Sequence, residues 1–466
     1  MSRATDARRL ACEVGAVCRE RRAHAGDILD ARLQEADISS QDAAFARVLC
    51  LGVAATRGTL DEVLNLCMSS PSDVRPNVRD ALRVSTYEIL FLRKDSYAAV
   101  DQGVGLVRSV EPRASRLANA VLRKVARACE SFPFADPATD DAALARLHGF
   151  PLWLAQLLIA QMGREQAGRF MAASNNAPVV YLAVNAVRSS TSRMKQVFGR
   201  RFAMDEVPLL SLGTGAQVPG DRMVPGALLA QDAQAVASSR AREAFAEGEI
   251  LVSDAAAQFI AYLSLPEQRP YDFLEIGAGR GTKSVLLQSC AMRRWGEQVK
   301  LVPVDEHRFK IDLLRKRMNA YGCQLERAVS ADARDLTKVF GARVFDAALV
   351  DAPCSGVGTL RRHPEIRWRL RPEEVNDLAK LQLELLVQAA EHVRVGGQLT
   401  YSTCTVLATE NEFTVKRFLD TPIGANYRIL PYGRDAEGKP VLFFKSRLEA
   451  QGCDAHFAAR LVRVGE

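Results

Sequence analysis

The sequence predicts three parts in order: an all-α N-terminal domain, a small α+β middle segment and a C-terminal α/β domain with a doubly wound parallel sheet. Helical periodicity without a convincing strand pattern covers residues 1 to about 130, whereas short apolar strands alternate with helices from Tyr271 onward. The length of 466 residues also exceeds one ordinary domain. We place the three parts at residues 1–135, 142–250 and 251–466.

The composition is that of a soluble globular protein, with 48% hydrophobic and 25% charged residues. No uninterrupted apolar run reaches the roughly 20 residues of a membrane-spanning helix, and the N-terminus lacks the pattern of a signal peptide. Ten scattered cysteines argue for free thiols rather than a disulfide framework, so we expect a cytoplasmic protein. The net charge of +7 allows a polyanionic partner without proving one.

In the first part, three segments with one apolar face predict helices of a bundle, at residues 45–60, 78–92 and 114–125. Prolines and acids mark residues 131–141 as a linker. The middle segment combines a helical pattern at 142–173 with two short strands, 179–185 and 248–253. The turn-rich span between these strands is not placed by the sequence.

The third part has strands expected at 271–276, 299–304, 326–331, 345–350 and 398–402, with a crossover helix at 372–394 before the last of them. The first four strands each end in an acidic residue: Glu275, Asp305, Asp332 and Asp351. Ligands bind to open α/β sheets at the carboxyl ends of the strands. Acids at four successive strand ends therefore predict a ligand site at this edge.

A glycine-rich turn follows the first of these strands and opens a helix, with the sequence Gly277-Ala278-Gly279-Arg280-Gly281-Thr282-Lys283. Glycines there let the backbone approach a nucleoside-type ligand closely, although they also serve simple tight turns between strand and helix. Asp305 stands where an acid commonly binds ribose hydroxyls. We predict an adenosine-bearing cofactor, and the lack of a pyrophosphate-specific feature favours S-adenosylmethionine over NAD.

Two cysteines are expected at neighbouring strand ends, Cys354 in Asp351-Ala-Pro-Cys and Cys404 in Tyr401-Ser-Thr-Cys. A lone cysteine is usually a small buried hydrophobe. Neither has a second Cys or His at the spacing of a structural zinc site, so we expect no metal. Two thiols facing one crevice beside an aspartate favour covalent catalysis, with one attacking and the other assisting.

Residues 361–371 contain five arginines around one tryptophan. This pattern is typical of a solvated basic turn, or of a surface for single-stranded nucleic acid in which arginines bind phosphates and the indole stacks on a base. We favour the second interpretation, with the RNA-binding residues Arg361, Arg362, Arg367 and Trp368.

These motifs resemble those of the bacterial RsmB (Sun/Fmu) family of ribosomal RNA cytosine-5 methyltransferases. Residues 351–368 resemble the family's fourth motif, and residues 401–405 with Glu410-Asn411 resemble its sixth. Residues 82–93, 98–102 and 119–124 resemble its NusB-like helical RNA-binding domain. The resemblance implies a NusB-like first domain, a Rossmann-like class I methyltransferase third domain and the cofactor S-adenosyl-L-methionine.

The resemblance also implies residue roles. Cys404 would attack C6 of cytosine, Cys354 would assist release of the product, and Asp351 would hold the base. Residues 277–283 would enclose the methionine end of the cofactor, Asp305 its ribose and Asp332 its adenine. A Thr-Cys thiol in addition to the Pro-Cys thiol points to RNA as the substrate, because DNA cytosine-5 enzymes use the Pro-Cys thiol as nucleophile.

Three segments depart from the family pattern. Ser253-Asp254 stands where Gln-Asp is expected. Residues 277–284 replace Ala-Ala-Pro-Gly-Gly-Lys-Thr, and residues 452–457 replace a segment that contains Asp-Gly-Phe-Phe. Our interpretation is a monomeric methyltransferase of small-subunit (16S) ribosomal RNA, acting on naked or early-assembly RNA. The alternatives are a transfer RNA cytosine-5 methyltransferase and a NusB-like RNA-binding or ribosome-assembly factor without catalytic turnover.

Overall fold

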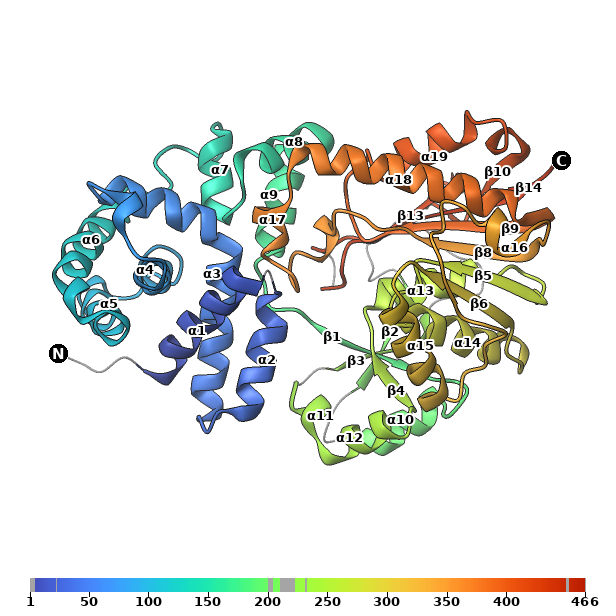
Figure 1. Cartoon of the computed structure of the whole chain (residues 1–466), viewed down its shortest axis with the longest axis horizontal. Helices are drawn as coiled ribbons and strands as arrows, with labels where there is room; N and C mark the ends of the chain where they lie inside the picture. Colours follow the sequence, from blue (N-terminus) through green and yellow to red (C-terminus); the bar gives the residue numbers. More distant parts are fainter. Residues whose placement is uncertain are drawn as a thin grey trace. The chain divides into compact units, whose positions relative to one another are not determined.

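The structure is a computed structural model that describes residues 5–21, 23–199, 204–209, 223–230, 233–449 and 452–465 (Figure 1). It divides into two compact units. The helical unit comprises Met1–Asn176 and Thr359–Pro372, and the α/β unit comprises Ala177–Gly358 and Glu373–Glu466. The segment Thr359–Pro372 therefore belongs to the helical unit although the sequence on both sides of it belongs to the α/β unit.

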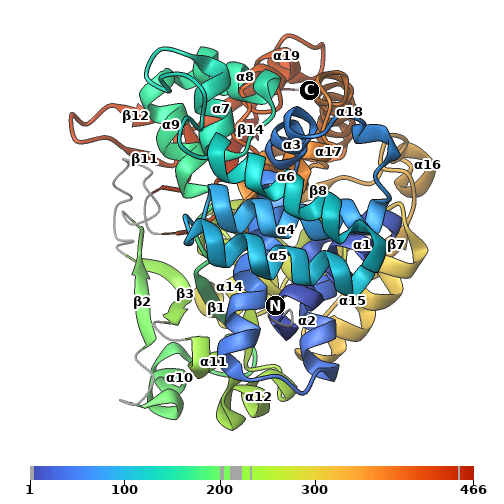
Figure 2. The same cartoon turned by 90° about the vertical axis from the view of Figure 1, so that its left-hand side faces the viewer.

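The helical unit is a bundle in which α4, α5 and α6 run side by side (Figure 2). The predicted helices at 45–60, 78–92 and 114–125 are confirmed as α3, α4 and α6. The helices are α1 (Asp6–Arg21), α2 (Ala25–Glu35), α3 (Ser40–Cys67), α4 (Pro76–Leu90), α5 (Ser96–Val110), α6 (Ser115–Ala128), α7 (Asp141–His148), α8 (Leu152–Met162), α9 (Arg164–Ala173) and α17 (Ile366–Arg369).

The longest of these helices, α3, contributes one of its faces to the bundle core. Ser39 caps its N-terminus by accepting a hydrogen bond from the backbone N–H of Asp42. By length and composition alone α3 could cross a membrane, as could the sharply bent pair α7 and α8, but core helices of soluble proteins pass the same test. Leu49, Leu60 and Leu64 are fully buried against the neighbouring helices, which accounts for the apolar character of α3.

The division of the chain corrects two predictions about the middle segment. Helices α7 to α9 belong to the helical unit, and the boundary lies after Asn176 rather than near residue 135. Residues 131–141 are not a linker between domains, because Phe132 is buried in the helical core with its ring 5.5 Å from that of Phe91. Because Phe132 packs into the helical core, residues 131–141 form a packed turn rather than the expected linker.

The strands of the middle segment form an antiparallel sheet of four strands in the order β2-β3-β1-β4, flanked by three short helices. Its β1 and α13 share one core with the larger sheet, so the strands belong to the α/β unit. Residues 210–222 of the turn-rich span lie outside the described residues. The elements are β1 (Val180–Val184), α10 (Thr191–Phe198), β2 (Met204–Pro208), β3 (Met223–Ala230), α11 (Ala233–Ala237), α12 (Ser239–Ala246), β4 (Ile250–Val252) and α13 (Ala255–Ser264).

The large sheet has the strand order β10-β14-β9-β8-β5-β6-β7, with β13 paired to β14. The five strands from β9 to β7 are parallel, which confirms the predicted doubly wound arrangement, and β14 runs antiparallel beside β9. The strands are β5 (Asp272–Ile276), β6 (Lys300–Asp305), β7 (Val329–Ser330), β8 (Phe345–Asp351), β9 (Val393–Thr403), β10 (Tyr427–Leu430), β11 (Gly433–Arg434), β12 (Pro440–Val441), β13 (Phe443–Lys445) and β14 (Phe457–Arg463).

Helices cover both faces of this sheet, with α13, α14 and α15 on one side and α18 and α19 on the other (Figure 1). Alternate residues of β8 face the two cores: Leu349 packs with the first set and Val350 with the second. A strand buried on both faces explains why its sequence is continuously apolar. The helices are α14 (Thr282–Trp295), α15 (Arg308–Ala320), α16 (Thr337–Phe340), α18 (Pro372–Glu391) and α19 (Glu412–Leu419).

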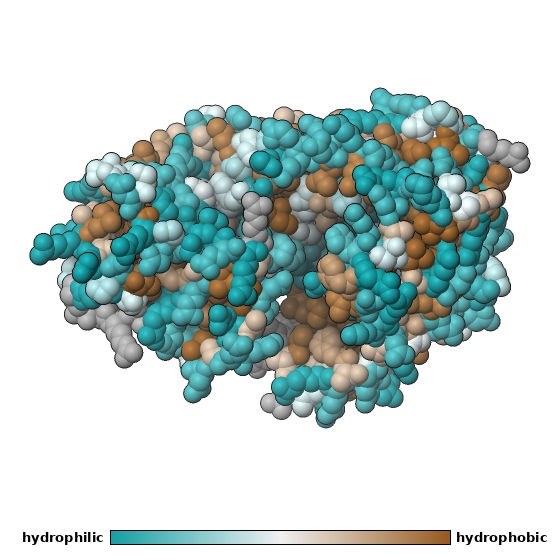
Figure 3. All heavy atoms as spheres, viewed as in Figure 1, coloured by the Kyte–Doolittle hydropathy of each residue, from teal (hydrophilic) through white to brown (hydrophobic). Residues whose placement is uncertain are grey.

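Two boundaries differ from the sequence expectation. The third strand, β7, has only two residues, and α18 ends at Glu391, so that Gly396 and Gly397 lie inside β9. On the face shown in Figure 3, hydrophilic residues cover most of the surface and apolar residues form scattered patches.

The order of the parallel strands reverses at β5, because β6 lies on one side of it and β8 on the other. Such a switch point opens a crevice at the carboxyl ends of β5 and β8.

Candidate active site

The glycine-rich turn lies directly against the end of β8. Gly277 has a φ of +77°, and a Cβ atom placed on it would come within 2.2 Å of the backbone oxygen of Asp351. No other residue fits this position without a backbone shift. The backbone N–H of Gly279 donates to Asp305 Oδ2 at 3.0 Å, which fastens the turn to the end of β6. The turn is therefore tight and also leaves backbone close to the crevice, as both interpretations of the sequence required.

The two predicted ribose and adenine acids differ in environment. Asp305 is buried and also accepts a hydrogen bond from the backbone N–H of His307, so its carboxylate is held in place. Asp332 is exposed and binds the guanidinium of Arg334 through both oxygens, and these bonds lower its pKa. The observed strand β7 is shorter than the predicted one, so Asp332 lies two residues past its end. Arg280 points to solvent, and Thr282 accepts a hydrogen bond from Arg317.

An ion pair occupies the crevice between β5 and β8. Lys283 Nζ, from the first turn of α14, lies 2.7 Å from Asp351 Oδ2, and Ser402 Oγ donates to Asp351 Oδ1 at 3.1 Å. Burial works to lower the pKa of Lys283, but the charge of Asp351 and the hydrogen bond to it outweigh burial and hold that pKa above its ordinary value. The carboxylate is thus fixed through both oxygens beside a permanent cation.

The structure brings the two predicted cysteines together. β8 and β9 are parallel neighbours with Asp351 opposite Ser402, and the Sγ atoms of Cys354 and Cys404 lie 3.0 Å apart. This separation is too long for a disulfide, whose S–S bond is about 2.05 Å. The backbone N–H of Cys404 donates to Cys354 Sγ at 3.2 Å. The hydrogen bond with the Cys404 thiol, burial and nearby negative charge raise the pKa of Cys354 well above its ordinary value. Cys354 therefore keeps its proton at neutral pH.

A buried glutamate joins the two cysteine loops, a role that sequence reasoning did not assign. Glu410 is fully buried and accepts hydrogen bonds from the backbone N–H of Ser355 (2.8 Å), from Ser355 Oγ and from Gln382 Nε2 (2.9 Å). Burial raises the pKa of Glu410, although these donors lower it in part. Ser355 follows Cys354, and Glu410 lies in the loop after Cys404, so one carboxylate sets the spacing of both thiols. The available signal was the Glu410-Asn411 pair beside the Thr-Cys motif.

His456, in the departing segment before β14, interacts electrostatically with both groups of the same ion pair. The pairing of Phe457 with Thr403 puts His456 level with Cys404 on the adjacent strand. The side chain is buried, and its Nδ1 has no hydrogen-bond partner among the described residues. Burial lowers the pKa of His456 against the opposing charges of Asp254 and Asp351, so the imidazole is neutral.

The arginine-rich segment corrects part of the predicted RNA surface. Arg361 and Arg367 are buried inside the helical unit. Arg367 Nη1 bonds the Asn175 side chain at 2.9 Å, and its guanidinium lies 4.1 Å from the ring centre of Phe150. The RNA-contact prediction is therefore wrong for these two arginines, because a buried guanidinium cannot reach a phosphate. Arg362 is half-exposed and stays a prediction. Trp368 Nε1 donates to the backbone oxygen of Ala55 at 2.8 Å, which holds the indole against α3.

One group of side chains in the helical unit has a geometry that could hold a metal ion. His24, His363 and Glu365 place ligand atoms within 4.8 Å of one another. His24 Nδ1 already contacts Glu365 Oε1, so a hydrogen bond accounts for part of the cluster. The expectation that no metal binds stays a prediction.

Two family models match this chain. The model of the 16S rRNA methyltransferase RsmB/F matches residues 262–441, and that of the NusB family matches residues 5–127. Ribosomal RNA small subunit methyltransferase B of Escherichia coli O6:K15:H31 (strain 536 / UPEC) is 31% identical over 385 residues, which cover 82% of this chain and 83% of the relative. The chain belongs to this family. It is a methyltransferase, with a NusB domain at its N-terminus and a Rossmann-like methyltransferase fold in its C-terminal part.

Other relatives agree. Ribosomal RNA small subunit methyltransferase B of Klebsiella pneumoniae (strain 342) is 29% identical over 88% of this chain and 91% of its own. The probable ribosomal RNA small subunit methyltransferase B of Synechocystis sp. is 28% identical over 84% of each chain. The crystal structure of PH0851 has a TM-score of 0.76 at 19% identity and covers 99% of this chain and 100% of its own. NSun6 from Pyrococcus horikoshii with SFG has a TM-score of 0.54 at 15% identity, covering 69% of this chain and 100% of its own. At these identities the two structures show a common fold.

Proposed function

We propose that this protein transfers a methyl group from S-adenosylmethionine to C5 of a cytosine in small-subunit (16S) ribosomal RNA, through a covalent bond between Cys404 and C6 of the base. The observation that carries the proposal is the pair of thiols 3.0 Å apart beside the fixed carboxylate of Asp351. A methyltransferase that methylates a hydroxyl or an amine needs no such pair of thiols. The names of the relatives in the family support ribosomal RNA as the substrate.

The residues of the glycine-rich turn fit the cofactor. The space against Asp351 that a Cβ at Gly277 would fill is backbone-lined. Asp305 binds two backbone N–H groups and lies 3.5 Å from Lys310 Nζ, and a carboxylate has further acceptor lone pairs for ribose hydroxyls. When bound, S-adenosylmethionine supplies a methyl group on a sulfonium. Residues 277–283 and Asp305 would hold it. Asp332 would bind the adenine with its carboxylate while that carboxylate stays paired with Arg334.

The protein groups would act on the cytosine as follows. The Cys404 thiolate forms a bond to C6, and the ring electrons move toward C5, which then accepts the methyl group. Asp351 accepts hydrogen bonds from the exocyclic amine or from protonated N3, and the ion pair with Lys283 holds that carboxylate in position. Lys283 also interacts electrostatically with Cys404, the kind of neighbour that reactive thiolates have.

In the last step the C5 proton passes to water or a base, the C5–C6 double bond reforms and Cys404 leaves as a thiolate. Cys354 carries a proton and lies within hydrogen-bond distance of the departing sulfur, so it can stabilise the thiolate as the bond breaks. The target base must leave its stack to reach this position.

The test is transfer of a labelled methyl group from S-adenosylmethionine to naked 16S ribosomal RNA, with transfer RNA alongside, followed by mapping of 5-methylcytosine. We expect label at a cytosine of the ribosomal RNA. Label only in transfer RNA would keep the chemistry and overturn the substrate, and label at a position other than C5 would overturn the chemistry.

The thiol roles are tested with two variants and one control. Cys354→Ala should accumulate a covalent protein–RNA adduct, and Cys404→Ala should form none. Cys129→Ala, which changes a half-buried thiol in the helical unit, should behave like the unchanged protein. Adduct accumulation in Cys404→Ala but not in Cys354→Ala would reverse the assignment.

A further inference from the structure

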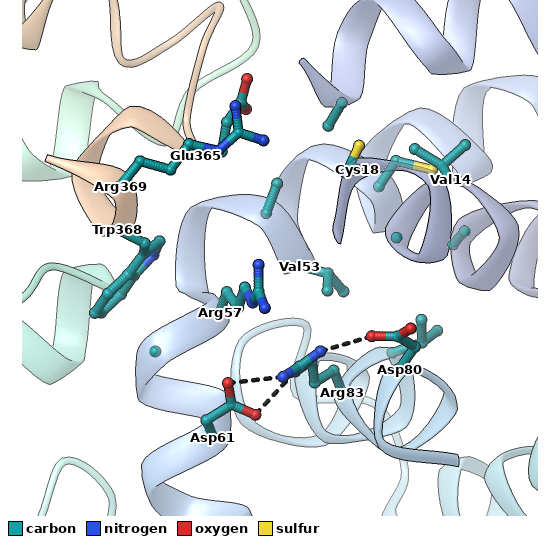
Figure 4. A pocket seen from close by; sticks show the side chains of 17 residues that line it. Val14, Cys18, Val53, Arg57, Asp61, Asp80, Arg83, Glu365, Trp368 and Arg369 are labelled. Carbon is teal, nitrogen blue, oxygen red and sulfur yellow. Dashed lines mark hydrogen bonds and ion pairs between the residues drawn. The ribbon is translucent and has the colours of Figure 1, made fainter. Parts of the chain in front are cut away.

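The helical unit contains a pocket that the methyl-transfer site does not use. It has a volume of about 340 Å³ and lies between α1, α3, α4 and the segment 365–369 (Figure 4). Val14, Cys50 and Val53 contribute apolar walls, and the Trp368 indole closes one side. All of these residues belong to the helical unit. The volume lies at the lower end of the roughly 300–1,000 Å³ range of ligand pockets, which suits one nucleotide-sized group.

Most of the charge in the pocket is compensated. Arg83 binds both oxygens of Asp61, at 2.8 and 2.9 Å, and Asp80 at 2.6 Å, as the dashed lines in Figure 4 mark. Asp80 also pairs with Arg19 at 3.2 Å. This network is closed on itself and forms one end of the pocket. It offers no unpaired charge to a ligand.

Two further charged groups that line the pocket are Glu365, whose Oε2 has no hydrogen-bond partner among the described residues, and Arg57. The Arg57 guanidinium projects into the middle of the pocket and makes no hydrogen bond or ion pair with any residue that the structure describes (Figure 4). Arg57 is half-buried, and burial followed by the charge of Arg83 lowers its pKa, although the charges of Asp61 and Asp80 oppose this shift. A cation that is partly desolvated and next to another cation is stabilised by an incoming anion. The pocket thus combines a guanidinium that has no hydrogen-bond partner with an aromatic wall and apolar sides.

We propose that this pocket binds one nucleotide of single-stranded RNA, with Arg57 at the phosphate and the base between Trp368 and the apolar wall. Planar bases stack on aromatic side chains and guanidinium groups, and phosphates bind arginine. The proposal rests on the proposed function for its RNA partner. It moves the predicted base contact of Trp368 from an open basic turn to a pocket in the helical unit.

The origin of the Trp368 wall favours RNA over a free nucleotide. The segment Thr359–Pro372 follows the Cys354 loop, whose end is tied to the Cys404 loop by the hydrogen bond from Gly358 N–H to the Cys404 backbone oxygen at 3.0 Å. It then leads into α18. A nucleotide held against Trp368 therefore contacts the same stretch of chain that carries a catalytic thiol. A substrate RNA, which contacts the protein at several nucleotides, has a use for this continuity in sequence, whereas a free nucleotide has none.

The experiment measures binding of a fluorescein-labelled single-stranded 16S ribosomal RNA fragment to the full-length protein by anisotropy, without cofactor, over a series of salt concentrations. Arg57→Ala should weaken binding about tenfold or more and should reduce the salt slope by about one. Val53→Phe, which fills the pocket without changing charge, should also weaken binding. Arg127→Ala removes an exposed arginine of α6 outside the pocket and should change the affinity less than about twofold. Circular dichroism checks that each variant is folded.

Crosslinking gives a second readout that needs no variant. RNA that contains 4-thiouridine should crosslink to peptides carrying Arg57 or Trp368. Unchanged RNA affinity in both Arg57→Ala and Val53→Phe, with no crosslink in these peptides, would overturn the proposal. So would saturable binding of cytidine monophosphate that depends on Arg57 while RNA affinity does not, because the pocket would then serve a free nucleotide. Arg57-dependent RNA binding in a protein that transfers no methyl group would support this inference and count against the proposed function alone.

Discussion

Replacing Glu410 by alanine tests whether one buried carboxylate holds the two cysteine loops together. In the folded protein this side chain accepts hydrogen bonds from Ser355 N–H, Ser355 Oγ and Gln382 Nε2. Two of these donors have other partners: Ser355 Oγ lies 2.9 Å from Thr405 Oγ1, and Gln382 Nε2 donates to the Pro353 backbone oxygen at 2.9 Å. The variant therefore leaves one fully orphaned donor, the backbone N–H of Ser355.

The magnitude follows from that inventory. An orphaned buried donor costs about 1–3 kcal/mol. The cavity left by the missing side chain adds about 1 kcal/mol, and loss of the buried charge returns part of the sum. We expect Glu410→Ala to lower the free energy of unfolding of the α/β unit by about 1–3 kcal/mol. Methyl transfer should fall further than stability does, because the loop of Cys354 loses its fixed position relative to Cys404.

The assay is urea unfolding followed by hydrogen exchange of peptides from β8 and β9, which assigns the loss to the α/β unit. Glu437→Ala, which removes an exposed glutamate paired with Lys439, is the matched control and should stay within about 0.5 kcal/mol of the unchanged protein. A Glu410→Ala protein with unchanged stability and an unchanged rate of adduct formation would refute the reasoning.

Three further predictions concern backbone, pH and the corrected arginine. Gly277→Ala should abolish S-adenosylmethionine binding measured by calorimetry. It should also lower the free energy of unfolding by several times the roughly 1 kcal/mol expected for Gly296→Ala. Both glycines have positive φ, but only at Gly277 would the added Cβ meet another backbone atom. Burial raises the pKa of Glu275 to about 7, so the folded chain binds more protons than the unfolded chain between about pH 4.5 and 7. The free energy of unfolding should therefore fall by about 3 kcal/mol as pH rises through that window. Urea unfolding at a series of pH values checks this, and the fall should be smaller in Glu275→Gln. Arg367→Ala should destabilise the helical unit by about 3 kcal/mol in thermal unfolding while Arg362→Ala changes little, and equal effects would contradict the assigned burial.

Local patterns in the sequence determined the main elements and one part of the site. Periodicity located α3, α4 and α6, and apolar runs ending in acids located the parallel strands, because burial on one face or on both leaves a direct trace in residue order. The closeness of Cys354 and Cys404 followed from a single assumption, that β8 and β9 are neighbours in the sheet. The tight glycine turn followed from its position between strand and helix.

Only the tertiary structure decided where the charged segment and the middle helices belong. Five arginines in a row of eleven residues look alike whether they face water, RNA or a protein core, and the burial of Arg361 and Arg367 depends on helices far away in the sequence. The tertiary structure also decided that Glu410 joins the two cysteine loops and that His456 lies level with Cys404 on the adjacent strand. Sequence periodicity reports which face of an element is buried, whereas partners across the fold are set by the packing of elements that share no local pattern.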